Sequence, residues 1–414
     1  MTNTKITKAD AGTDKAIGLR RTLTLPLLTL YGLGVTVGAG IYVLIGTTVA
    51  QAGPFAWVAF LLAAFVVGFT AFSYAELATR FPVSAGEAAY VAAGFKQPWL
   101  ATVVGLLVVV SGMVSASAVA VGASGYLGDM TGLPSAPLIV GIVATMGLLA
   151  WWGITQSVTV AAVVTVIEIL GLCLVIAWGV GFSAQGGTPA SELLPPLQGS
   201  HWGGIISASL LAFFAFIGFE DMVNVAEEVE NPRRTIPLAI VYTLIVATLL
   251  YIATCVAVLL AVPLEKLAGS AAPLTLVFAN APEAIKLGFA AIAVVATING
   301  VLIQMIMASR VLYGMADRGG LPAIFARLSP RTRTPSVATA FVTASILGLG
   351  LFLPIEQLAA WTSQIVLCVF VCVNLSLVAI KHRSPGAGDH FHVPVAVPIC
   401  GVGASIALLV IPLT

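Results

Sequence analysis

Five glycines lie in the stretch GLGVTVGAGIYVLIG, residues 32–46, within an apolar run that carries no charge from residue 22 to residue 75. Glycine inside a helix costs about 1 kcal/mol relative to alanine, so we expect an interruption around residues 37–40. An interrupted helix exposes N–H groups that attract a carboxylate and frees carbonyls that attract an ammonium group. The stretch therefore predicts a site for a zwitterion. The alternative is close helix packing, as in G-x-x-x-G.

A second interruption is predicted in FFAFIGFEDMVNVAEE, residues 213–228, where Gly218 precedes an acidic pair. Glu220 and Asp221 either cap the second half-helix at its positive end or recognise a cationic side chain. Corresponding interruptions in the two halves of a membrane protein are the best sequence indication of a binding site near the bilayer midplane. Together, the two interruptions favour a ligand site over simple packing.

Glu168 is a third candidate, because VVTVIEILGL places it in the middle of an apolar segment. A charged side chain near the bilayer centre costs about 2.5 to 3.5 kcal/mol on insertion scales, so it needs a partner or a function. We consider a proton carrier, a ligand for a cation or a substrate ammonium group, and a permanently protonated carboxyl group bonded to a backbone carbonyl. Asn299 and Thr297 are expected to share its polar pocket. Tyr42, Ser115, Ser117 and Asn374 are further candidates for cavity polar groups.

The elements that position these residues are membrane helices. Apolar residues make up 59% of the chain and charged residues 8%, against about 25% charged residues in soluble domains. We predict an all-α polytopic membrane protein, with the lipid bilayer as its surroundings. Eleven helices are expected, at residues 24–50, 55–79, 98–124, 136–154, 157–182, 203–227, 236–261, 284–315, 336–353, 356–380 and 395–413.

The distribution of Lys and Arg predicts the orientation. With the N-terminus in the cytoplasm, sixteen of these residues fall inside and only Lys266 and Lys286 fall outside. Cytoplasmic loops carry this excess of positive charge, so we expect an integral protein of the cytoplasmic (inner) membrane. Residues 1–22 form a polar cytoplasmic arm, which is too long to belong to a cleavable signal peptide.

The interruptions stand five helices apart, which predicts two inverted repeats. The first repeat covers residues 23–182 and holds helices 1–5. The second covers residues 203–381 and holds helices 6–10. Residues 395–414 contain an additional helix 11.

Four motifs in this order resemble the amino acid-polyamine-organocation transporters, most closely the bacterial permeases similar to cationic amino acid transporters. They are GVTVGAGIYVLIG, SYAELATRFPVSAGEAAYV, FFAFIGFEDMVNVAEEVENPRRTIPLAI and SRVLYGMADRGGLPAIFARLSPRTRTPSVAT. The resemblance implies the LeuT-like fold with ten core helices in a 5+5 inverted repeat. It also implies secondary active transport of amino acids by alternating access, as proton-coupled symport or as exchange of amino acids or amines. A non-transporting nutrient sensor on the same scaffold is the other alternative.

The resemblance also assigns site residues. The helix 1 break, which binds the substrate through its backbone, falls on Thr36, Val37, Gly38, Ala39, Gly40 and Ile41. The helix 6 break falls on Phe216, Ile217, Gly218, Phe219 and Glu220. Phe216 is expected to gate the substrate, and Glu227 and Glu228 are expected to pair with basic residues of the inner gate. Relatives often carry Lys where this chain has Glu168, and they usually have twelve helices.

Other chemistry is not indicated. The chain has no H-E-x-x-H, no G-x-S-x-G and no phosphate-binding loop, so we expect neither an enzyme nor a primary pump. His390 and His392 form an H-x-H that we interpret as a solvated loop, and we expect no metal site and no cofactor, with a proton as the coupling ion. The five cysteines are expected to be reduced. We expect no nucleic-acid partner, and the sequence makes no prediction of oligomeric state.

Overall fold

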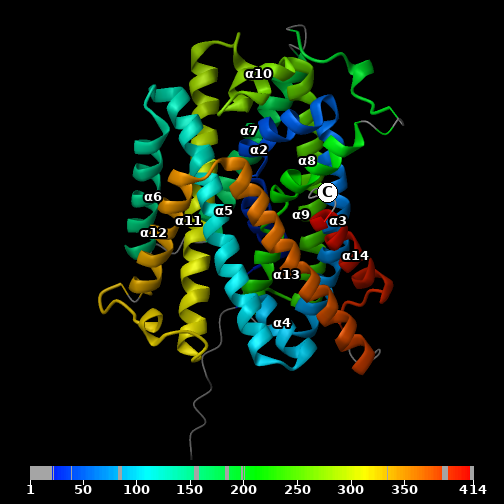
Figure 1. Cartoon of the computed structure of the whole chain (residues 1–414), viewed down its shortest axis with the longest axis vertical. Coiled ribbons are helices and arrows are strands. Elements are labelled where there is room, and N and C mark those ends of the chain that lie inside the picture. Colours follow the sequence, from blue (N-terminus) through cyan, green and yellow to red (C-terminus); the bar gives the residue numbers. More distant parts are fainter. Residues whose placement is uncertain are drawn as a thin grey trace, which may run out of the picture.

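The computed structural model describes residues 21, 23–38, 40–82, 86–152, 158–181, 186–196, 199, 201–332, 334–384 and 390–410. The helices stand side by side as an elongated bundle (Figure 1). The α-helices are α1 (Leu25–Val37), α2 (Gly40–Ala52), α3 (Ala56–Arg80), α4 (Gly86–Phe95), α5 (Pro98–Thr131), α6 (Ser135–Trp152), α7 (Val158–Gly181), α8 (Trp202–Phe214), α9 (Pro232–Ala261), α10 (Leu264–Ala268), α11 (Glu283–Asp317), α12 (Ser336–Phe352), α13 (Ile355–Arg383) and α14 (Ala396–Val410). The short 3₁₀ segments are η1 (Gly53–Phe55), η2 (Ala190–Glu192), η3 (Phe219–Glu228), η4 (Pro273–Phe278) and η5 (Ala323–Ala326).

Both predicted interruptions are present. The first membrane segment divides at Gly38, between the end of α1 and the start of α2. The sixth divides at residues 215–218, where α8 gives way to the 3₁₀ segment η3 and Gly218 has a φ of +121°. A side chain with a Cβ rarely adopts that φ, so glycine is needed at the turn.

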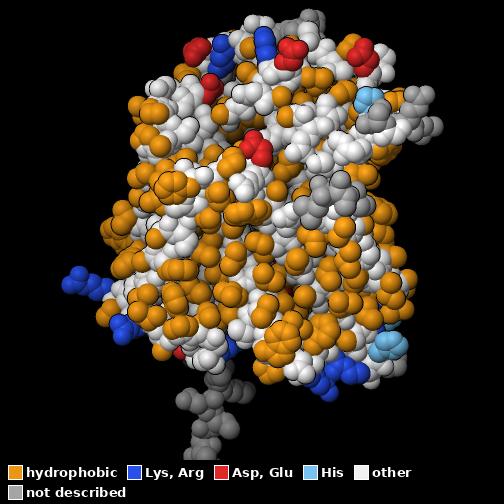
Figure 2. All heavy atoms as spheres, in the orientation of Figure 1, with side chains coloured by type: hydrophobic (Ala, Val, Ile, Leu, Met, Phe, Trp, Pro, Cys, Tyr) orange, Lys and Arg blue, Asp and Glu red, His pale blue; other side chains and the backbone are white. Residues whose placement is uncertain are grey.

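The outer surface fits a bilayer. Figure 2 shows a broad hydrophobic band between two ends where most charged side chains gather, with Lys and Arg prominent at the end near α4 (Figure 1). Within the part of the chain that the structure describes, eight segments are long and apolar enough to cross a membrane, and α12 and α14 are shorter apolar helices. One of the eight, Leu25–Arg80, contains α1, α2 and α3 and so covers two predicted spans. Each of the eleven predicted ranges contains helical residues, and the chain is a polytopic membrane protein. The count of eleven membrane spans stays a prediction.

The interrupted helices lie at the centre of the bundle. Helix α1 packs between α7 and α9, α2 packs against α8, and the long helices α5 and α11 run along each other. A parallel β-bridge joins Leu23, just before α1, to Val229, just after η3. The Leu23 N–H donates to the Glu228 carbonyl, and the Glu230 N–H donates to the Leu23 carbonyl, each over 3.0 Å. The ends of the two interrupted segments are therefore tied together through their main chains.

A buried ion pair holds the end of α13. The Glu76 carboxylate on α3 is 0% exposed, with Lys381 Nζ 2.7 Å from Oε2 and Arg80 Nη2 2.6 Å from Oε1. The Val393 N–H donates to Glu76 Oε2 over 2.8 Å, and Lys381 Nζ donates to the Val393 carbonyl over 2.6 Å. One carboxylate thus fastens α3, α13 and the segment before α14 to one another.

Arg383 extends this contact to α4. Its guanidinium group donates to the carbonyls of Ala93 and Gly94, which lie in the last turn of α4. Carbonyls at the end of a helix have no partner within it, and a cation there also complements the helix dipole. The last turn of α13 therefore binds α3 through Lys381 and α4 through Arg383.

We predict that Lys381→Met destabilises the protein by about 3 kcal/mol, because removing one partner leaves the buried Glu76 carboxylate with Arg80 as its one close cationic partner among the described residues. Thermal unfolding in detergent measures the effect. Lys286→Met is the control, since Lys286 Nζ lies 3.9 Å from Glu283 at the surface, where ion pairs contribute less than about 1 kcal/mol. Equal unfolding temperatures for the two variants would contradict the prediction.

Candidate substrate site

The two interruptions are in contact. A methyl group added at Gly218 would lie 2.7 Å from Val35 Cγ1 and 3.0 Å from the Val35 carbonyl oxygen. A methyl group added at Gly40 would overlap the backbone of Ala215. Glycines at these two positions therefore let the main chains of α1, α2 and the helix 6 turn approach each other directly.

Tyr251 of α9 spans the contact. Its hydroxyl oxygen lies 2.8 Å from the Thr36 carbonyl oxygen at the end of α1 and 2.8 Å from the Ala215 carbonyl oxygen after α8. The ring is fully buried and packs edge-on against Phe216, with centroids 5.0 Å apart. The last carbonyls of a helix find no N–H donor within that helix. Tyr251 therefore supplies a hydrogen-bond donor from a neighbouring helix.

A small cavity, the break cavity, opens beside the interruptions. It is lined by Val35, Thr36, Gly40, Ser115, Phe214, Ile217, Gly300, Ile303 and Gln304. The Thr36 hydroxyl is buried and has no hydrogen-bond partner among the described residues. The volume is about 20 Å³, which holds a water molecule but no amino acid. The cavity therefore combines exposed main chain with an unsatisfied hydroxyl group.

A second cavity, the acidic cavity, lies beside the first. Three residues line both cavities: Ser115, Ile217 and Gln304. Its carboxylic acids are Glu87 from α4 and Glu220 and Asp221 from η3. Burial raises the pKa of Glu87 above its ordinary value, although Tyr74 donates a hydrogen bond to its Oε1 over 3.2 Å. The cavity thus provides a carboxyl-rich wall next to the interruptions.

Glu220 caps the turn of helix 6. Its Oε2 accepts a hydrogen bond over 2.8 Å from the N–H of Gly218, the residue that precedes η3, which favours capping over direct recognition of a cationic side chain. Asp221 also lines the acidic cavity and is 8% exposed. Asp221 thus lines the same cavity as Glu220, and Glu220 uses its Oε2 to bind the Gly218 N–H.

Glu168 lies against the helix 1 break. A methyl group placed on Gly38 would be 3.1 Å from Glu168 Oε1. The side chain is 1% exposed, and Asn299 of α11 interacts with its carboxyl group. The Thr297 hydroxyl instead donates to the Ala293 carbonyl within its own helix, over 2.8 Å. The structure therefore brings Glu168, Gly38 and Asn299 together, whereas the Thr297 hydroxyl bonds within its own helix.

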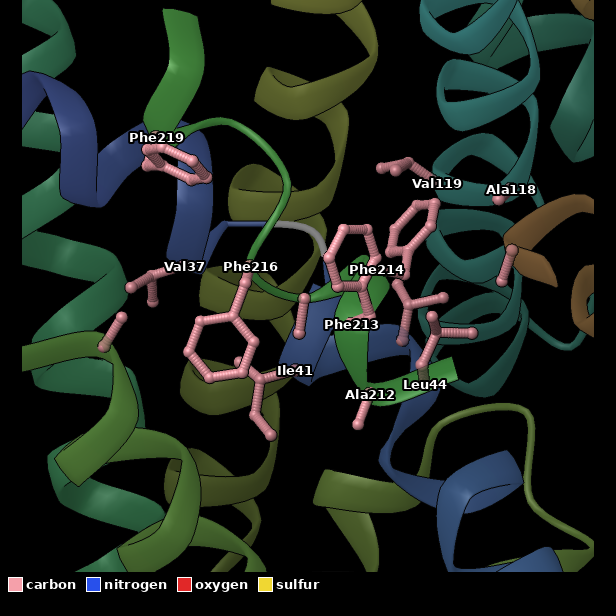
Figure 3. Packing of buried hydrophobic residues seen from close by; sticks show 14 of the residues in the cluster. Val37, Ile41, Leu44, Ala118, Val119, Ala212, Phe213, Phe214, Phe216 and Phe219 are labelled. Atoms are coloured by element: carbon pink, nitrogen blue, oxygen red, sulfur yellow. The ribbon is translucent and has the colours of Figure 1, made fainter. Parts of the chain in front are cut away.

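The remaining helix 1 and helix 6 residues divide between core and cavity. Val37, Ile41 and Phe216 are fully buried in the apolar cluster of Figure 3 and line neither cavity. Phe214 and Ile217 are the apolar residues of this turn that face the break cavity. Ala39 and the Glu227 side chain lie outside the described residues. Gating by Phe216, Glu227 and Glu228 stays a prediction.

His390 and His392 are not an isolated pair. Their ring nitrogens lie within 4.8 Å of each other and of a Glu76 oxygen, a spacing that could hold a metal ion. Lys381 Nζ, however, lies 3.3 Å from His392 Nδ1 and 2.7 Å from Glu76 Oε2, and Arg80 contacts the other oxygen. Two cations already face one carboxylate, and they would repel a divalent ion. This geometry favours the lysine ammonium group as the resident cation.

Several residues of the site were not found from the sequence. Gln304 lies one turn after Gly300 on the same face of α11, a spacing of four residues that could have indicated it. Tyr251 resembles an ordinary core tyrosine in the sequence ATLLYIATC.

The four predicted cavity polar groups have different surroundings. Ser115 lines both cavities. The other three side chains donate to backbone carbonyls: Ser117 to Met113, Asn374 to Phe370, and Tyr42 to Glu168.

Comparison with known proteins identifies the family. The family model described as amino acid permease matches residues 23–414. The chain belongs to the amino acid permease family. It is 30% identical to the branched-chain amino acid permease BcaP of Bacillus subtilis, over 97% of this chain and 90% of that protein.

Two further relatives have different names. The chain is 32% identical to cationic amino acid transporter 2, vacuolar, of Arabidopsis thaliana, over 89% of this chain and 61% of that longer protein. It is 28% identical to the methylthioribose transporter of Bacillus subtilis, over 94% of this chain and 88% of that protein. The family resemblance is thus confirmed, and these relatives are permeases and transporters, so the permease is a transporter and not an enzyme.

We predict that Gly40→Ala lowers the thermal stability of the permease, because the new methyl group would overlap the Ala215 backbone and force the two interruptions apart. Overpacking of this kind costs about 1–3 kcal/mol. Gly141→Ala in α6 is the matched control, since a methyl group there would meet no atom within 4 Å. An unfolding temperature for Gly40→Ala equal to that of Gly141→Ala would refute the close contact.

Proposed function

We propose that this permease is a secondary active transporter that moves amino acids across the cytoplasmic membrane by alternating access, with proton-coupled symport as its mode. The observation that carries the proposal is the contact between the two interruptions beside a shared cavity. Membership of the amino acid permease family and the names of the relatives support the choice of substrate class.

The proposed architecture is the LeuT-like 5+5 inverted repeat. The interruptions occur in the first and sixth membrane segments, which is the arrangement expected of two inverted units. The excess of Lys and Arg on one side supports a cytoplasmic N-terminus. In this orientation α4, η5 and the contacts that Lys381 and Arg383 make at the end of α13 lie on the cytoplasmic side.

Recognition of the zwitterion is proposed to use the main chain. The carboxylate would meet the N–H groups at the start of α2, where the helix dipole is positive. The Thr36 hydroxyl, which has no partner among the described residues, would be an additional donor. The ammonium group would meet the carbonyls at the ends of α1 and α8. Backbone groups would bind the carboxylate and ammonium groups that all amino acids share, and the cavity walls would contact the side chain.

Substrate entry requires the walls to move. The break cavity holds about 20 Å³, so an amino acid enters only when Phe214, Ile217 or their neighbours shift. Coupling of ligand entry to such a rearrangement is the basic requirement of alternating access.

Glu168 is the proposed proton carrier. It lies against Gly38 at the helix 1 break, so a change in its charge acts directly on the backbone that binds the substrate. The alternatives, a ligand for a cation or for a substrate ammonium group and a permanently protonated carboxyl group, use the same position, and the Glu168→Gln experiment below tests the proton carrier against them.

The transport proposal is tested by uptake of labelled amino acids into proteoliposomes with and without an inward proton gradient. We expect accumulation above equilibrium only with the gradient, and its collapse on adding a protonophore. Thermal-shift screening against the common amino acids identifies which one to label. Binding without any uptake would favour the nutrient-sensor alternative over transport.

We predict that Glu168→Gln abolishes accumulation driven by the proton gradient and leaves exchange across the membrane measurable, because glutamine keeps the shape but carries no titratable proton. Glu356→Gln, which changes an exposed carboxyl group at the start of α13, is the matched control. Gradient-driven accumulation at the wild-type level in Glu168→Gln would exclude the proton carrier.

A further inference from the structure

Tyr251 offers one hydrogen to two acceptors. Its hydroxyl oxygen is 2.8 Å from the Thr36 carbonyl oxygen and 2.8 Å from the Ala215 carbonyl oxygen. A tyrosine hydroxyl has a single hydrogen, so it satisfies one carbonyl at a time. The other carbonyl oxygen then faces the lone pairs of the hydroxyl at hydrogen-bonding distance. Among the described residues, the arrangement is therefore one donor short.

The missing donor can come from the break cavity. Thr36 lines the break cavity, and so do Phe214, which precedes Ala215, and Ile217, which follows Ala215 by two residues. Leaving a buried carbonyl without a donor is unfavourable. A ligand in the break cavity that brings its own N–H donors would relieve the shortage, and an ammonium group carries three such hydrogens.

We propose that Tyr251 is a positioning residue for the substrate's ammonium group: its hydroxyl holds the carbonyls of the two interruptions around one point and leaves one of them to be satisfied by the substrate. The inference rests on the proposed function and adds a residue that touches no substrate atom. Its effect on binding passes through the Thr36 and Ala215 carbonyls.

The surroundings of Tyr251 fit a fixed position. The ring is fully buried and packs against Phe216 and Phe60, with centroids 5.0 and 5.9 Å away. Helix α9, which carries it, packs against both α1 and η3. Since the ring is held on two sides, its hydroxyl stays between the two carbonyls when one of them changes partner.

The test compares two ligands and two variants. Tyr251→Phe keeps the ring and removes the hydroxyl. Tyr126→Phe is the matched control, since Tyr126 is another fully buried tyrosine whose hydroxyl donates to a backbone carbonyl, that of Tyr42, over 2.5 Å. Binding is measured for the transported amino acid and for its 2-hydroxy acid analogue, which lacks the ammonium group.

We expect Tyr251→Phe to bind the amino acid about tenfold more weakly while its affinity for the 2-hydroxy acid stays within a factor of two of wild type. Tyr126→Phe should leave the ratio of the two affinities unchanged, even where it lowers the unfolding temperature. A merely structural role for Tyr251 would weaken both ligands equally. An unchanged or increased preference for the amino acid in Tyr251→Phe would overturn the proposal.

A second measurement does not depend on the stability of Tyr251→Phe. With 3-fluorotyrosine introduced at position 251, fluorine NMR reports on the hydrogen bond of the adjacent hydroxyl. We expect the resonance to shift on saturation with the amino acid and to stay in place with the 2-hydroxy acid, and identical responses to both ligands would overturn the role of Tyr251. Failure of the wild-type permease to bind any amino acid would instead refute the proposed function.

Discussion

The structure depends on one constraint, which is that main-chain polar groups within a bilayer must find partners inside the protein. Two membrane segments of this permease are interrupted, and each interruption frees N–H and carbonyl groups at a depth where water is scarce. The chain meets the constraint by placing the interruptions against each other through Gly40 and Gly218 and by bringing in polar side chains from other helices. Tyr251 serves the carbonyls and Glu220 serves the Gly218 N–H.

The same constraint explains where the polar side chains lie. Glu168, Asn299, Ser115 and Gln304 come from α7, α11 and α5, and each is at least nine-tenths buried near the interruptions. A carboxyl or amide group in this apolar chain is costly unless it has a partner or a function. The irregular main chain and the buried polar groups therefore occupy one region, and the rest of each helix is free to be apolar.

The sequence predicted the interruptions because they depend on local chemistry, namely glycines at positions 38, 40 and 218. Glu168 was also predictable, since a single charge in an apolar segment stands out. The role of Tyr251 was not, because its hydrogen-bond acceptors are 215 and 36 residues away and exist only once both helices are broken. Similarly, Glu76 could not be joined to Lys381 and His392 from the sequence, since their contact depends on how α3, α13 and the following segment pack.

The bridge between Leu23 and Val229 has a mechanical consequence. Because two main-chain hydrogen bonds, each 3.0 Å long, connect the residue that precedes α1 with the segment that follows η3, neither half-helix can swing away from the bundle by itself. Any tilt that admits a solute between these ends must therefore move α1 and η3 together, with the bending concentrated at Gly38 and Gly218.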